Sequence, residues 1–315
     1  MPELPDLTVY LEHLERRVAG RPLLAVRLQS PFVLRTFDPP LREAHGKRVL
    51  GLRRLGKRIV LCLEEDLFLV VHLMIAGRFR WRDEPAAKIP GKLGLAAFDF
   101  PAGTLLLTEA STKKRAALHL VRGEEGLRAH DRGGLEPLAA DLPAFRAALQ
   151  REVHTLKRSL TDPRLFAAIG NAYSDEILHR ARLSPMRRTD GLDDAAIARL
   201  YEATRATLHE WIDRLRREAG DEFPENVTAF RPEMAVHGRY RQPCPDCGAP
   251  VQRIIYAENE CNYCARCQNE GRMLADRSLS RLLKDDWPRT IDELEERNVV
   301  GAPAAKGGKG GKRRR

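Results

Sequence analysis

The segment LKRSLTDPRLFAAIGNAYSDEILHRARLSP, residues 156–185, decides how the second half of this chain folds. Apolar residues recur at helical spacing in residues 164–169 and again in residues 172–183, which predicts two helical pieces. Between them, the hinge AIGNAYSDE places Gly170 and Asn171 just before a helix start. Backbone N–H groups at such a start can hold a phosphate, although one hinge of this kind is a weak signal by itself.

Helical sequence surrounds this segment and predicts one helical domain over residues 141–232. LPAFRAALQREV opens the domain, and LDDAAIARLYEATRATLHEWIDRLRRE, residues 192–218, is its longest helical stretch. Acidic residues occupy the first turn of that stretch and arginines the last, an arrangement that the helix dipole favours. We therefore expect a long helix towards the end of this domain.

Residues 1–130 show a different pattern, which predicts a leading helix and a β-sandwich or small barrel. Apolar residues recur at helical spacing from Leu7 to Val18. Short strand-forming runs then follow up to Val121, separated by turn signals such as DEPAAKIPGK. The longest apolar run, Leu67 to Ile75, contains His72 and predicts a buried strand. The runs are LLAVRL, RIVLCL, LFLVVHL, GRFRW, LAAFDF, TLLLTE and ALHLV.

Residues 235–268 hold five of the six cysteines and predict a small zinc-binding domain. Cys244 and Cys247 form one CxxC pair, and Cys264 and Cys267 form a second pair after sixteen intervening residues. This spacing lies in the range of four-thiolate zinc sites. Four protein thiolates complete the tetrahedral shell of zinc and leave no open position, so we expect one structural zinc ion.

Two cysteines stay outside this assignment. Cys261 forms a rival CxxC pair with Cys264, with thirteen residues between the pairs, so the residues alone do not separate a spare thiol from a substitute ligand. Cys62 lies in an expected strand and is interpreted as a small buried apolar residue. A chance cluster or a disulfide pair is the alternative for the whole set.

Composition and charge describe a globular protein with a basic end. The chain has 315 residues, a formal net charge of +10, and 43% hydrophobic and 31% charged residues. No apolar run approaches the roughly 20 residues of a membrane span, and the acidic N-terminus is no signal peptide, so we expect a cytoplasmic, reducing location. Residues 269–298 are expected to form a helical extension. Residues 299–315 carry six Lys or Arg and no acid; we expect a disordered tail that either binds phosphate backbones or serves solubility or targeting.

The N-terminus, MPELPDLTVY, allows two interpretations of Pro2. A proline suits the first turn of a helix, where its missing N–H costs nothing. A small residue after Met1 also usually permits removal of the methionine, which would expose the ring nitrogen of Pro2 as a free secondary amine. These ten residues alone favour the first interpretation.

Four motifs in chain order resemble those of the bacterial formamidopyrimidine-DNA glycosylase and endonuclease VIII family. They are PELP at the start, GKRIVLCL with LFLVVHLMIAGR, the segment 156–185, and the CxxC-x16-CxxC pattern that ends in CQ. The resemblance covers about residues 2–268. It implies an α+β multidomain protein with an N-terminal helix and β-sandwich, a helix-two-turn-helix DNA-binding domain, and a zinc finger that closes the cleft.

The resemblance also implies catalytic residues. In that family the exposed proline amine attacks C1′ of the damaged nucleotide, the base leaves, and the resulting iminium allows strand cleavage by elimination. Pro2 matches this nucleophile, Glu3 the acid that protonates the opening sugar, and Lys57 the lysine that assists base release and elimination. An α-amino group has a reference pKa of about 8, so a useful neutral fraction exists at neutral pH. The alternatives are a glutamate at a helix start and a solvated strand lysine.

The same resemblance places further residues on DNA. Asn171 matches the asparagine that binds the phosphates flanking the lesion, and Lys157 matches the basic residue before that hairpin. His72 begins the HLMIAGR turn and is expected to contact DNA as well. The alternative for Asn171 is a turn-forming residue before a helix.

Two regions depart from the family pattern. Asn259 stands where the zinc finger carries a DNA-reaching arginine, so the backbone contact weakens and the second, δ-elimination step is in doubt; Arg253 lies nearby and can compensate. Ile75 stands at the methionine that fills the gap left by the flipped base, and an apolar wedge still suits that role. Lys113 and Lys114, expected to hold phosphates, replace residues of the neighbouring void-filling loop; a charged hairpin facing solvent is their alternative.

We therefore expect a DNA glycosylase with AP-lyase activity that removes oxidised bases flipped out of double-stranded DNA, since C1′ is hidden in the stack. It is expected to be a monomer with one zinc ion, associated with the nucleoid. The alternatives are a catalytically reduced binder of damaged or abasic DNA and a zinc-ribbon adaptor. Pro2, Glu3 and Lys57 argue against the first, and the length of chain before the cysteines argues against the second.

Overall fold

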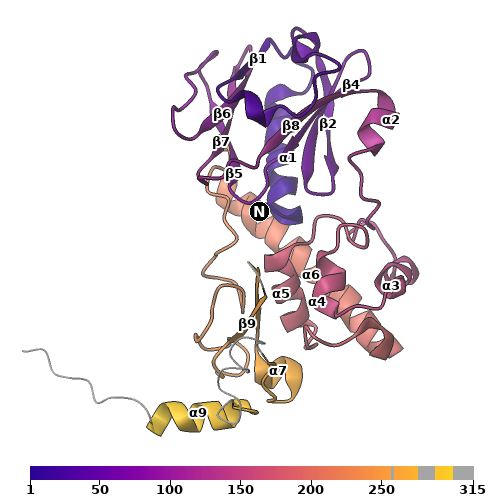
Figure 1. Ribbon diagram of the computed structural model, residues 1–315, viewed down its shortest axis with the longest axis vertical. Coiled ribbons are helices and arrows are strands. Elements are labelled where there is room, and N and C mark those ends of the chain that lie inside the picture. Colours follow the sequence, from indigo (N-terminus) through magenta and orange to yellow (C-terminus); the bar gives the residue numbers. More distant parts are fainter. Residues whose placement is uncertain (257–258, 276–287, 301–315) are drawn as a thin grey trace, which may run out of the picture.

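Figure 1 shows the computed structural model, which describes residues 1–256, 259–275 and 288–300. A β-sandwich with its leading helix lies at one end, a helical domain adjoins it, and a small unit built on a β-hairpin lies beside the helical domain (Figure 1). Within the described ranges, no helix has both the length and the apolar character that crossing a membrane requires. The arrangement of the sandwich, the helical domain and the small unit confirms the α+β organisation expected from the sequence.

Two four-stranded antiparallel sheets form the sandwich, and their inner faces enclose its apolar core. Alternating apolar residues in each strand supply these inner faces, as the two-residue period of a strand requires. The first sheet has the order β1 (Ala25–Leu28), β6 (Gly94–Phe100), β7 (Gly103–Glu109), β5 (Gly77–Arg82). The second has the order β2 (Val49–Leu55), β3 (Arg58–Leu63), β4 (Leu67–His72), β8 (Ala117–Arg122).

One strand was not predicted from the sequence, and another is shorter than predicted. The strand β2 was missed because Gly51, Arg53 and Arg54 interrupt its apolar pattern; it is an edge strand with a bulge in its pairing to β3. The apolar run predicted as one strand up to Ile75 ends as a strand at His72, and a turn follows.

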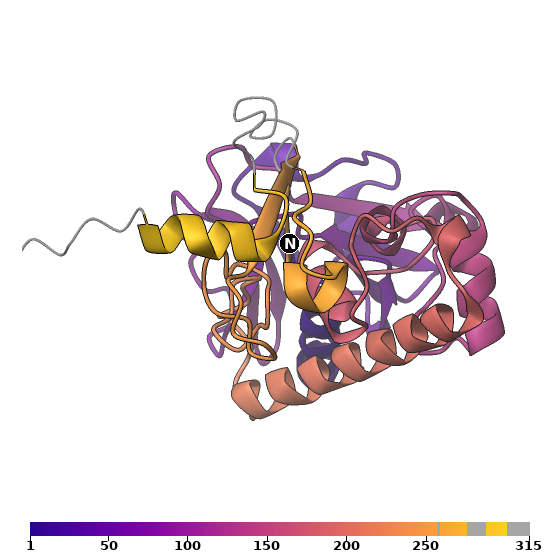
Figure 2. The ribbon, with the colours of Figure 1, turned by 90° about the horizontal axis from the view of Figure 1, so that it is seen from below.

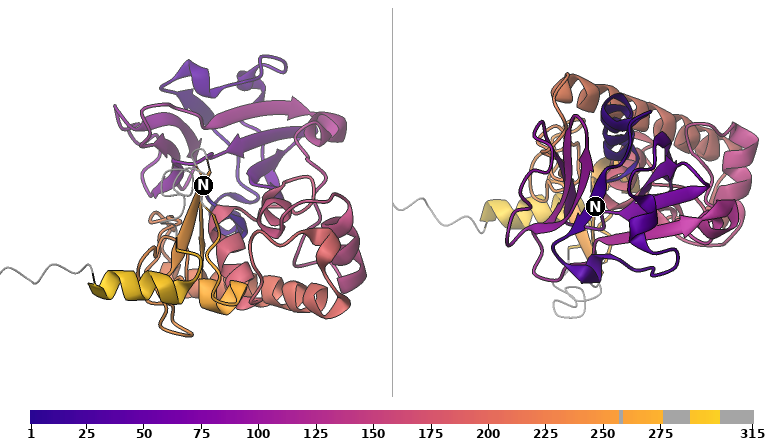
Figure 3. Two further views of the ribbon diagram at one scale, coloured as in Figure 1. Left: turned by 60° about the horizontal axis from the view of Figure 1, so that its bottom comes forward. Right: turned by 90° about the horizontal axis from the view of Figure 1, so that it is seen from above.

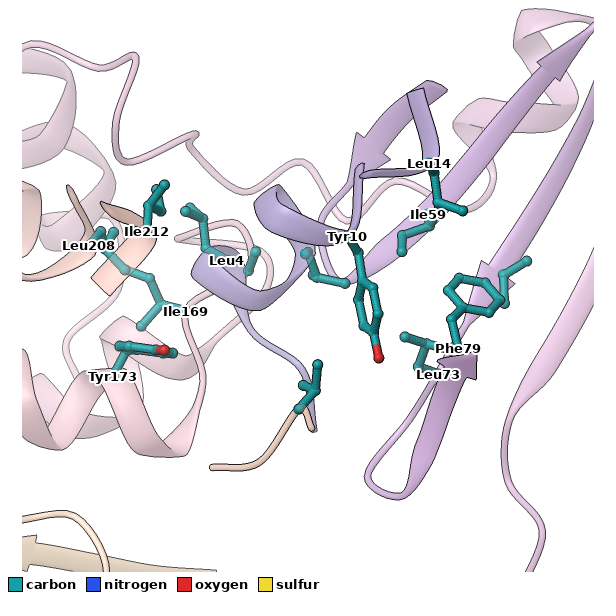
Figure 4. Packing of buried hydrophobic residues seen from close by; sticks show 14 of the residues in the cluster. Leu4, Tyr10, Leu14, Ile59, Leu73, Phe79, Ile169, Tyr173, Leu208 and Ile212 are labelled. Atoms are coloured by element: carbon teal, nitrogen blue, oxygen red, sulfur yellow. The ribbon is translucent and has the colours of Figure 1, made fainter. Parts of the chain in front are cut away.

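The helix α1 (Leu4–Val18) joins the sandwich to the helical domain. Figure 4 shows Leu4 near Leu208 and Ile212 on one side of α1, and Tyr10 beside Phe79 of the sandwich on the other. The rings of Tyr10 and Phe79 meet edge to face, with centroids 5.8 Å apart. Figure 3 shows α1 next to the longest helix, and the two helices are in contact. One continuous core therefore fixes the N-terminus against both domains.

The helical domain follows a short helix, α2 (Gly123–Arg128), and is built from capped helices. Asp141, Thr155 and Asp193 each use a side-chain oxygen to accept a backbone N–H bond at a helix start. The long helix predicted within residues 192–218 is confirmed, and it runs along one side of the molecule (Figure 2). The helices are α3 (Leu142–Gln150), α4 (Leu156–Thr161), α5 (Asn171–Arg180) and α6 (Asp194–Ala219).

The helix predicted over residues 164–169 is wrong. This stretch forms turns, and Phe166 makes an isolated parallel bridge with Leu135. Ala168 adopts a positive φ of 60°, and its carbonyl oxygen accepts the N–H of Leu4 at 3.0 Å. Contacts with distant segments thus override the local helical preference of this stretch.

The C-terminal unit has a core of its own, separate from the main one. Ile291 is fully buried in that core, and the N–H of Ile291 donates to Gly271 O at 2.8 Å. Residues 276–287 of the expected extension and residues 301–315 of the expected tail lie outside the described residues. The elements of the unit are β9 (Gln252–Tyr256), β10 (Asn259–Tyr263), α7 (Ala265–Asn269) and α9 (Ile291–Val300).

Candidate active site and metal centre

Glu3 lies where the first turn of α1 meets the first turn of α5. Its buried carboxylate accepts three backbone N–H bonds, from Gly170 at 2.7 Å, Ala172 at 3.0 Å and Tyr173 at 3.2 Å. These are N–H groups that a helix start leaves without partners inside the helix. The helix α5 therefore holds Glu3 in one position, and its dipole favours the negative charge there.

Gly170 leaves the space in which Glu3 and Lys57 approach each other. A Cβ on Gly170 would lie 2.5 Å from Glu3 Cδ, from Glu3 Oε1 and from Lys57 Nζ. Burial lowers the pKa of Lys57, the charge of Glu3 opposes this shift, and the charge of Lys157 adds to it. A lowered pKa increases the neutral fraction of the Lys57 amine, which a group that accepts a proton requires.

The start of the chain reaches the same place. Pro2 is buried, directly before Glu3. Burial lowers the pKa of the α-amino group, which Met1 carries here; the nearby carboxylate of Glu3 raises it, and Arg78 lowers it further. An amine at this end of the chain is therefore desolvated and adjacent to Glu3, which are the conditions that favour a neutral nucleophilic amine.

Gly170→Ala is expected to disrupt this meeting point without unfolding the protein. The added methyl group would displace Glu3 or Lys57, and displacement of a reacting group by about 1 Å costs on the order of 100-fold in rate. Gly191→Ala is the matched control, because a Cβ there meets nothing within 4 Å. Single-turnover cleavage of abasic-site DNA measures the effect. Equal rates for the two variants would contradict the assigned geometry.

Asp6 contributes a second buried carboxylate to the start of α1. Its Oδ2 accepts the N–H of Glu3 at 3.0 Å, and its Oδ1 lies 3.8 Å from Arg231 Nη2. Burial raises the pKa of Asp6 to about 6, although the bond from Glu3 and the charge of Arg231 oppose the shift.

The raised pKa of Asp6 predicts a pH-dependent stability. Because the folded pKa lies above the unfolded value of 3.8, the stabilising contribution is full below pH 3.8 and is lost as the pH rises through 6. Asp6→Asn cannot ionise, so its stability relative to the wild type is expected to increase by up to about 3 kcal/mol between pH 4 and pH 7.5. Thermal unfolding of both proteins across this range measures the difference. A difference that does not change with pH would refute the shift.

Asp175 of α5 connects its own helix to two neighbouring elements. Its side chain is fully buried, and its Oδ1 accepts Lys157 Nζ at 2.5 Å. Its Oδ2 shares a hydrogen bond with His237 Nδ1 at 2.7 Å and accepts the N–H of Asn262 at 3.1 Å. A buried carboxylate bonded in this way ties α4, α5 and β10 together.

Glu176, the next residue, holds the segment that leads into the C-terminal unit. Its carboxylate accepts the N–H groups of Ala235 at 2.7 Å, Val236 at 2.9 Å and His237 at 2.9 Å. Both acids come from α5, the helix whose first turn holds Glu3. The C-terminal unit is thus fixed to the same helix as the candidate catalytic carboxylate.

Lys157 and Asn171, both predicted DNA contacts, have partners within the protein. Lys157 Nζ donates to Asn171 O at 2.7 Å and to Ser174 Oγ at 2.8 Å, besides its bond to Asp175. Asn171 Nδ2 donates to Glu260 O of β10 at 2.7 Å. The ammonium group of Lys157 therefore already has three acceptors, and both side chains help to fix α5 against its neighbours.

His72 is the last residue of β4. Within the described part of the chain, its buried Nε2 has no hydrogen-bond partner. Burial lowers the pKa of His72 to about 4, and the charges of Arg58 and Lys57 lower it further. A neutral imidazole beside cationic groups is compatible with the predicted DNA contact, which stays a prediction.

Ile75 occupies the tip of the turn between β4 and β5. Its side chain is 57% exposed, as a wedge residue must be. Gly77 closes the turn, because a Cβ there would lie 2.1 Å from Leu73 O. Gly77 is paired with Glu109 at the end of β7, so the second predicted DNA-contacting loop starts beside this turn.

Glu109 organises that second loop. Its buried carboxylate accepts the N–H groups of Arg115 at 2.9 Å and Ala116 at 3.0 Å. The ammonium group of Lys114 donates to the backbone oxygen of Glu109. Lys113 and Lys114 are exposed, so the loop presents cations to the solvent at the edge from which Ile75 also projects.

Four cysteines form a candidate metal centre. The sulfur atoms of Cys244, Cys247, Cys264 and Cys267 all lie within 4.8 Å of one another. Two of these S···S distances are 3.9 Å and 3.4 Å, near the roughly 3.8 Å expected for a tetrahedral site with 2.3 Å metal–sulfur bonds. His179 of α5 places Nε2 3.3 Å from the sulfur of Cys244. The four thiols are arranged to hold one metal ion.

Cys261 is outside this group. It lies in β10, paired with Ile254, and its thiol is close to Asp175 rather than to the other sulfurs. Burial raises the pKa of Cys261 well above its usual value, and Asp175 raises it further. Cys62 lies in β3 and is buried in the outer apolar cluster of the sandwich, which confirms its prediction as a small buried apolar residue.

The hairpin of the C-terminal unit carries Arg253 and Asn259, the two residues that the sequence analysis considered for contact with the DNA backbone. Arg253 lies over the ring of Tyr240, 4.2 Å from its centroid, and its guanidinium group pairs with Glu260 at 3.2 Å. Asn259 begins β10, but its side chain lies outside the described residues. Arg253 therefore has local partners already.

Sequence reasoning missed Asp175, Glu176 and the steric role of Gly170. The sequence did contain a signal for them, because all three residues lie in the hinge AIGNAYSDE, which the sequence analysis singled out. The partners of these residues, however, come from segments far away in the sequence, which a local pattern does not reveal.

Comparison with known proteins supports this organisation. The family model of the formamidopyrimidine-DNA glycosylase N-terminal domain matches residues 1–120, and the model of the H2TH domain of that glycosylase matches residues 134–219. The formamidopyrimidine-DNA glycosylase of Heliobacterium modesticaldum is 35% identical over 285 residues, covering 85% of this chain and 100% of that protein. The protein of the same name from Thermus thermophilus is 33% identical, covering 86% of this chain and 100% of its own length.

Solved structures agree in fold. The complex of Lactococcus lactis Fpg with DNA containing an abasic site matches with a TM-score of 0.75 at 25% identity, covering 85% of this chain and 99% of that chain. MutM in complex with DNA containing carbocyclic 8-oxo-G matches with the same TM-score and identity, covering 85% of this chain and 100% of that chain.

Proposed function

The chain belongs to the formamidopyrimidine-DNA glycosylase family and is a DNA glycosylase of base-excision repair, and we propose that it also cleaves the strand through a Schiff base on its N-terminal proline. The observation that supports this most is the convergence of the chain start, Glu3 and Lys57 around Gly170. The solved relatives hold abasic or damaged DNA, and we propose double-stranded DNA with oxidised bases or abasic sites as the partner. The proposed working form is a monomer associated with the nucleoid.

In the proposed reaction, Met1 has been removed and the neutral amine of Pro2 adds to C1′ of the damaged nucleotide. The C1′–N bond to the base breaks, and the base leaves with the electron pair and takes up a proton. Glu3 takes up the proton that the Pro2 nitrogen loses once it is bonded to C1′, and passes this proton to the sugar ring oxygen. The C1′–O bond then breaks, the ring opens, and an iminium forms between Pro2 and C1′. Lys57 assists departure of the base and the loss of a proton from C2′, after which the C3′–O bond breaks and releases the phosphate.

The contacts of Glu3 explain why a carboxylate suits this position. Both oxygens accept N–H groups, Oε1 from Ala172 and Oε2 from Gly170 and Tyr173. In Glu3→Gln, the amide NH₂ group would face at least one of these donors and leave it without an acceptor. That variant therefore loses the transferable proton and also the fixed orientation.

We further propose that the ion held by the four cysteines is zinc, because thiolates in a tetrahedral set suit it. Zinc bound there would hold β9, β10 and α7 in one unit. The residues of α5 then transmit that placement to the site, as Asp175 and Glu176 bind this unit and the segment before it. All four ligand positions are filled by protein, so the role assigned to the ion is structural.

The decisive experiment is borohydride reduction in the presence of abasic-site DNA. The wild type is expected to give a covalent protein–DNA adduct, because reduction traps the iminium. If no adduct forms while the protein still binds this DNA, the Schiff-base proposal fails. The catalytically reduced binder then becomes the better description.

Asn259 is expected to limit the cut to β-elimination. An asparagine carries no charge, so its contact with the phosphate backbone is weaker than that of the arginine found at this position in the family. We expect mainly β-elimination ends on a denaturing gel, and we expect Asn259→Arg to increase the share of δ-elimination ends. A wild type that yields mostly δ-elimination ends would contradict this prediction.

A further inference from the structure

A group of basic side chains lies on the outer face of the second sheet. The register of the sheet places Arg58 opposite His72, and His72 opposite Ala117. Because side chains alternate along a strand, His119 lies on the same face as Ala117, two residues further along β8. Arg58, His72 and His119 therefore share the face that points away from the core of the sandwich.

Two other segments add to this face. The ring of His130, in the connection that follows α2, lies 4.5 Å from the ring of His119 between centroids. Arg35 lies in a segment that runs along the free edge of β8, where its N–H donates to Leu118 O at 2.8 Å. We call this set the outer-face cluster; its members are Arg35, Arg58, His72, His119, His130 and Arg132.

Arg35, Arg58 and Arg132 give the outer-face cluster its positive charge. Burial lowers the pKa of His119 to about 4, and neighbouring His130, Arg58 and Arg35 lower it further. Burial also lowers the pKa of Arg58, Arg132 adds to that shift, and Asp131 opposes it. A surface where cationic groups disfavour each other's charge gains stability when an anion binds to it.

The outer-face cluster is accessible at two of its arginines. Arg35 and Arg132 are exposed, whereas the Nε2 atom of His72, which has no partner within the described part of the chain, is buried. Phe37, two residues after Arg35, is 83% exposed. An apolar ring beside cations suits a sugar–phosphate backbone, because the deoxyribose is partly apolar and the phosphate is charged.

The outer-face cluster lies close to Lys57 of the candidate active site, since the charge of Lys57 acts on His72. Lys57, whose Nζ approaches Gly170 and Glu3, directly precedes Arg58 in the chain. We propose that the outer-face cluster is a second DNA contact surface, which binds the phosphate backbone of the duplex arm extending from the active site. This inference rests on the proposed function for the identity of the polyanion. It assigns a role to Arg35, His119, His130 and Arg132, which the reaction itself does not use.

A double variant, Arg35→Gln with Arg132→Gln, tests this proposal. Both side chains are exposed, so the fold should tolerate the change. Arg217→Gln is the matched control, because Arg217 is an exposed arginine on the last turn of α6. Binding of undamaged and abasic-site duplexes, in a long and a short form, is followed by fluorescence anisotropy across a range of salt concentrations.

Each lost phosphate contact should reduce the slope of log Kd against log salt by about 0.9, so the double variant should lose roughly 2 in slope on the long duplex. Affinity for that duplex should fall about 10-fold at low salt, while the short duplex and the control variant show no change. If the double variant binds the long duplex as well as the control does, the proposal is wrong. The same result is expected if this surface binds a protein instead of DNA. The salt dependence is also measured on undamaged DNA, so it does not depend on the reaction. A failure of borohydride trapping in the wild type would therefore refute the proposed function and leave this proposal standing.

Discussion

Retention of Met1 is expected to abolish borohydride trapping on abasic-site DNA, with a loss of roughly 1000-fold or more. In that form the nitrogen of Pro2 belongs to a peptide bond, and its electron pair is delocalised into the carbonyl group. The only α-amine would then be that of Met1, one residue before Pro2 and about 3.8 Å away by the Cα spacing. A displacement of that size removes the alignment with Glu3 and Lys57 on which the reaction depends.

The matched control for this experiment is Pro2→Gly. Glycine also permits removal of Met1, and it exposes a primary amine at the same place. We expect this variant to form the adduct, at a reduced rate, because the ring of proline no longer fixes the nitrogen. Mass spectrometry of each protein establishes which residue is first. Efficient trapping by the form that retains Met1 would show that another amine, that of Met1 or of Lys57, is the nucleophile.

The sequence predicted the metal site better than the catalytic site, for a physical reason. Cys244 and Cys247, like Cys264 and Cys267, are close in sequence, so their spacing alone predicts that they share one ion. Glu3, by contrast, is oriented by Gly170 and its neighbours more than 160 positions later. No local pattern encodes that contact, and the resemblance to a family was needed to suggest it.

Lys157 illustrates a different limit of sequence reasoning. A lysine before a phosphate-binding hinge is a reasonable DNA contact, and the sequence offers no sign that a buried acid lies within reach. In the fold, Asp175 and Ser174 accept bonds from its ammonium group. Position in a motif therefore predicted where Lys157 lies, whereas its bonding depended on which side chains of α5 face α4.

Removal of the metal ion is expected to unfold the C-terminal unit while the rest of the protein stays folded. The buried residues of this unit form a small core, separate from the continuous core of the sandwich and the helical domain. Structural zinc in finger peptides contributes roughly 10 to 16 kcal/mol of apparent binding energy, more than such a small core supplies by itself. Two separate thermal transitions should therefore appear after chelation, and the upper one should stay near its original temperature.

Removal of the metal ion should also disturb the catalytic site, because α5 contacts both this unit and Glu3. Unfolding of the hairpin removes the N–H of Asn262 from Asp175 and the acceptor Glu260 O from Asn171. Asp175 would keep its bond to Lys157 but lose part of the contacts that bury it, so the first turn of α5 becomes less ordered. We expect DNA affinity to fall roughly 100-fold, with a further loss in the cleavage rate on bound DNA.

Cys264→Ser provides the genetic form of this prediction, with two cysteine controls. Cys261→Ser should retain one equivalent of metal and the wild-type affinity for DNA, because Cys261 lies outside the group of four sulfurs. Cys62→Ala should do the same, because Cys62 lies in the sandwich. Metal analysis, thermal unfolding and DNA binding are measured on all three variants. Loss of metal in Cys261→Ser would assign the site to the rival CxxC pair of Cys261 and Cys264, and α5 would then be held by a differently folded hairpin.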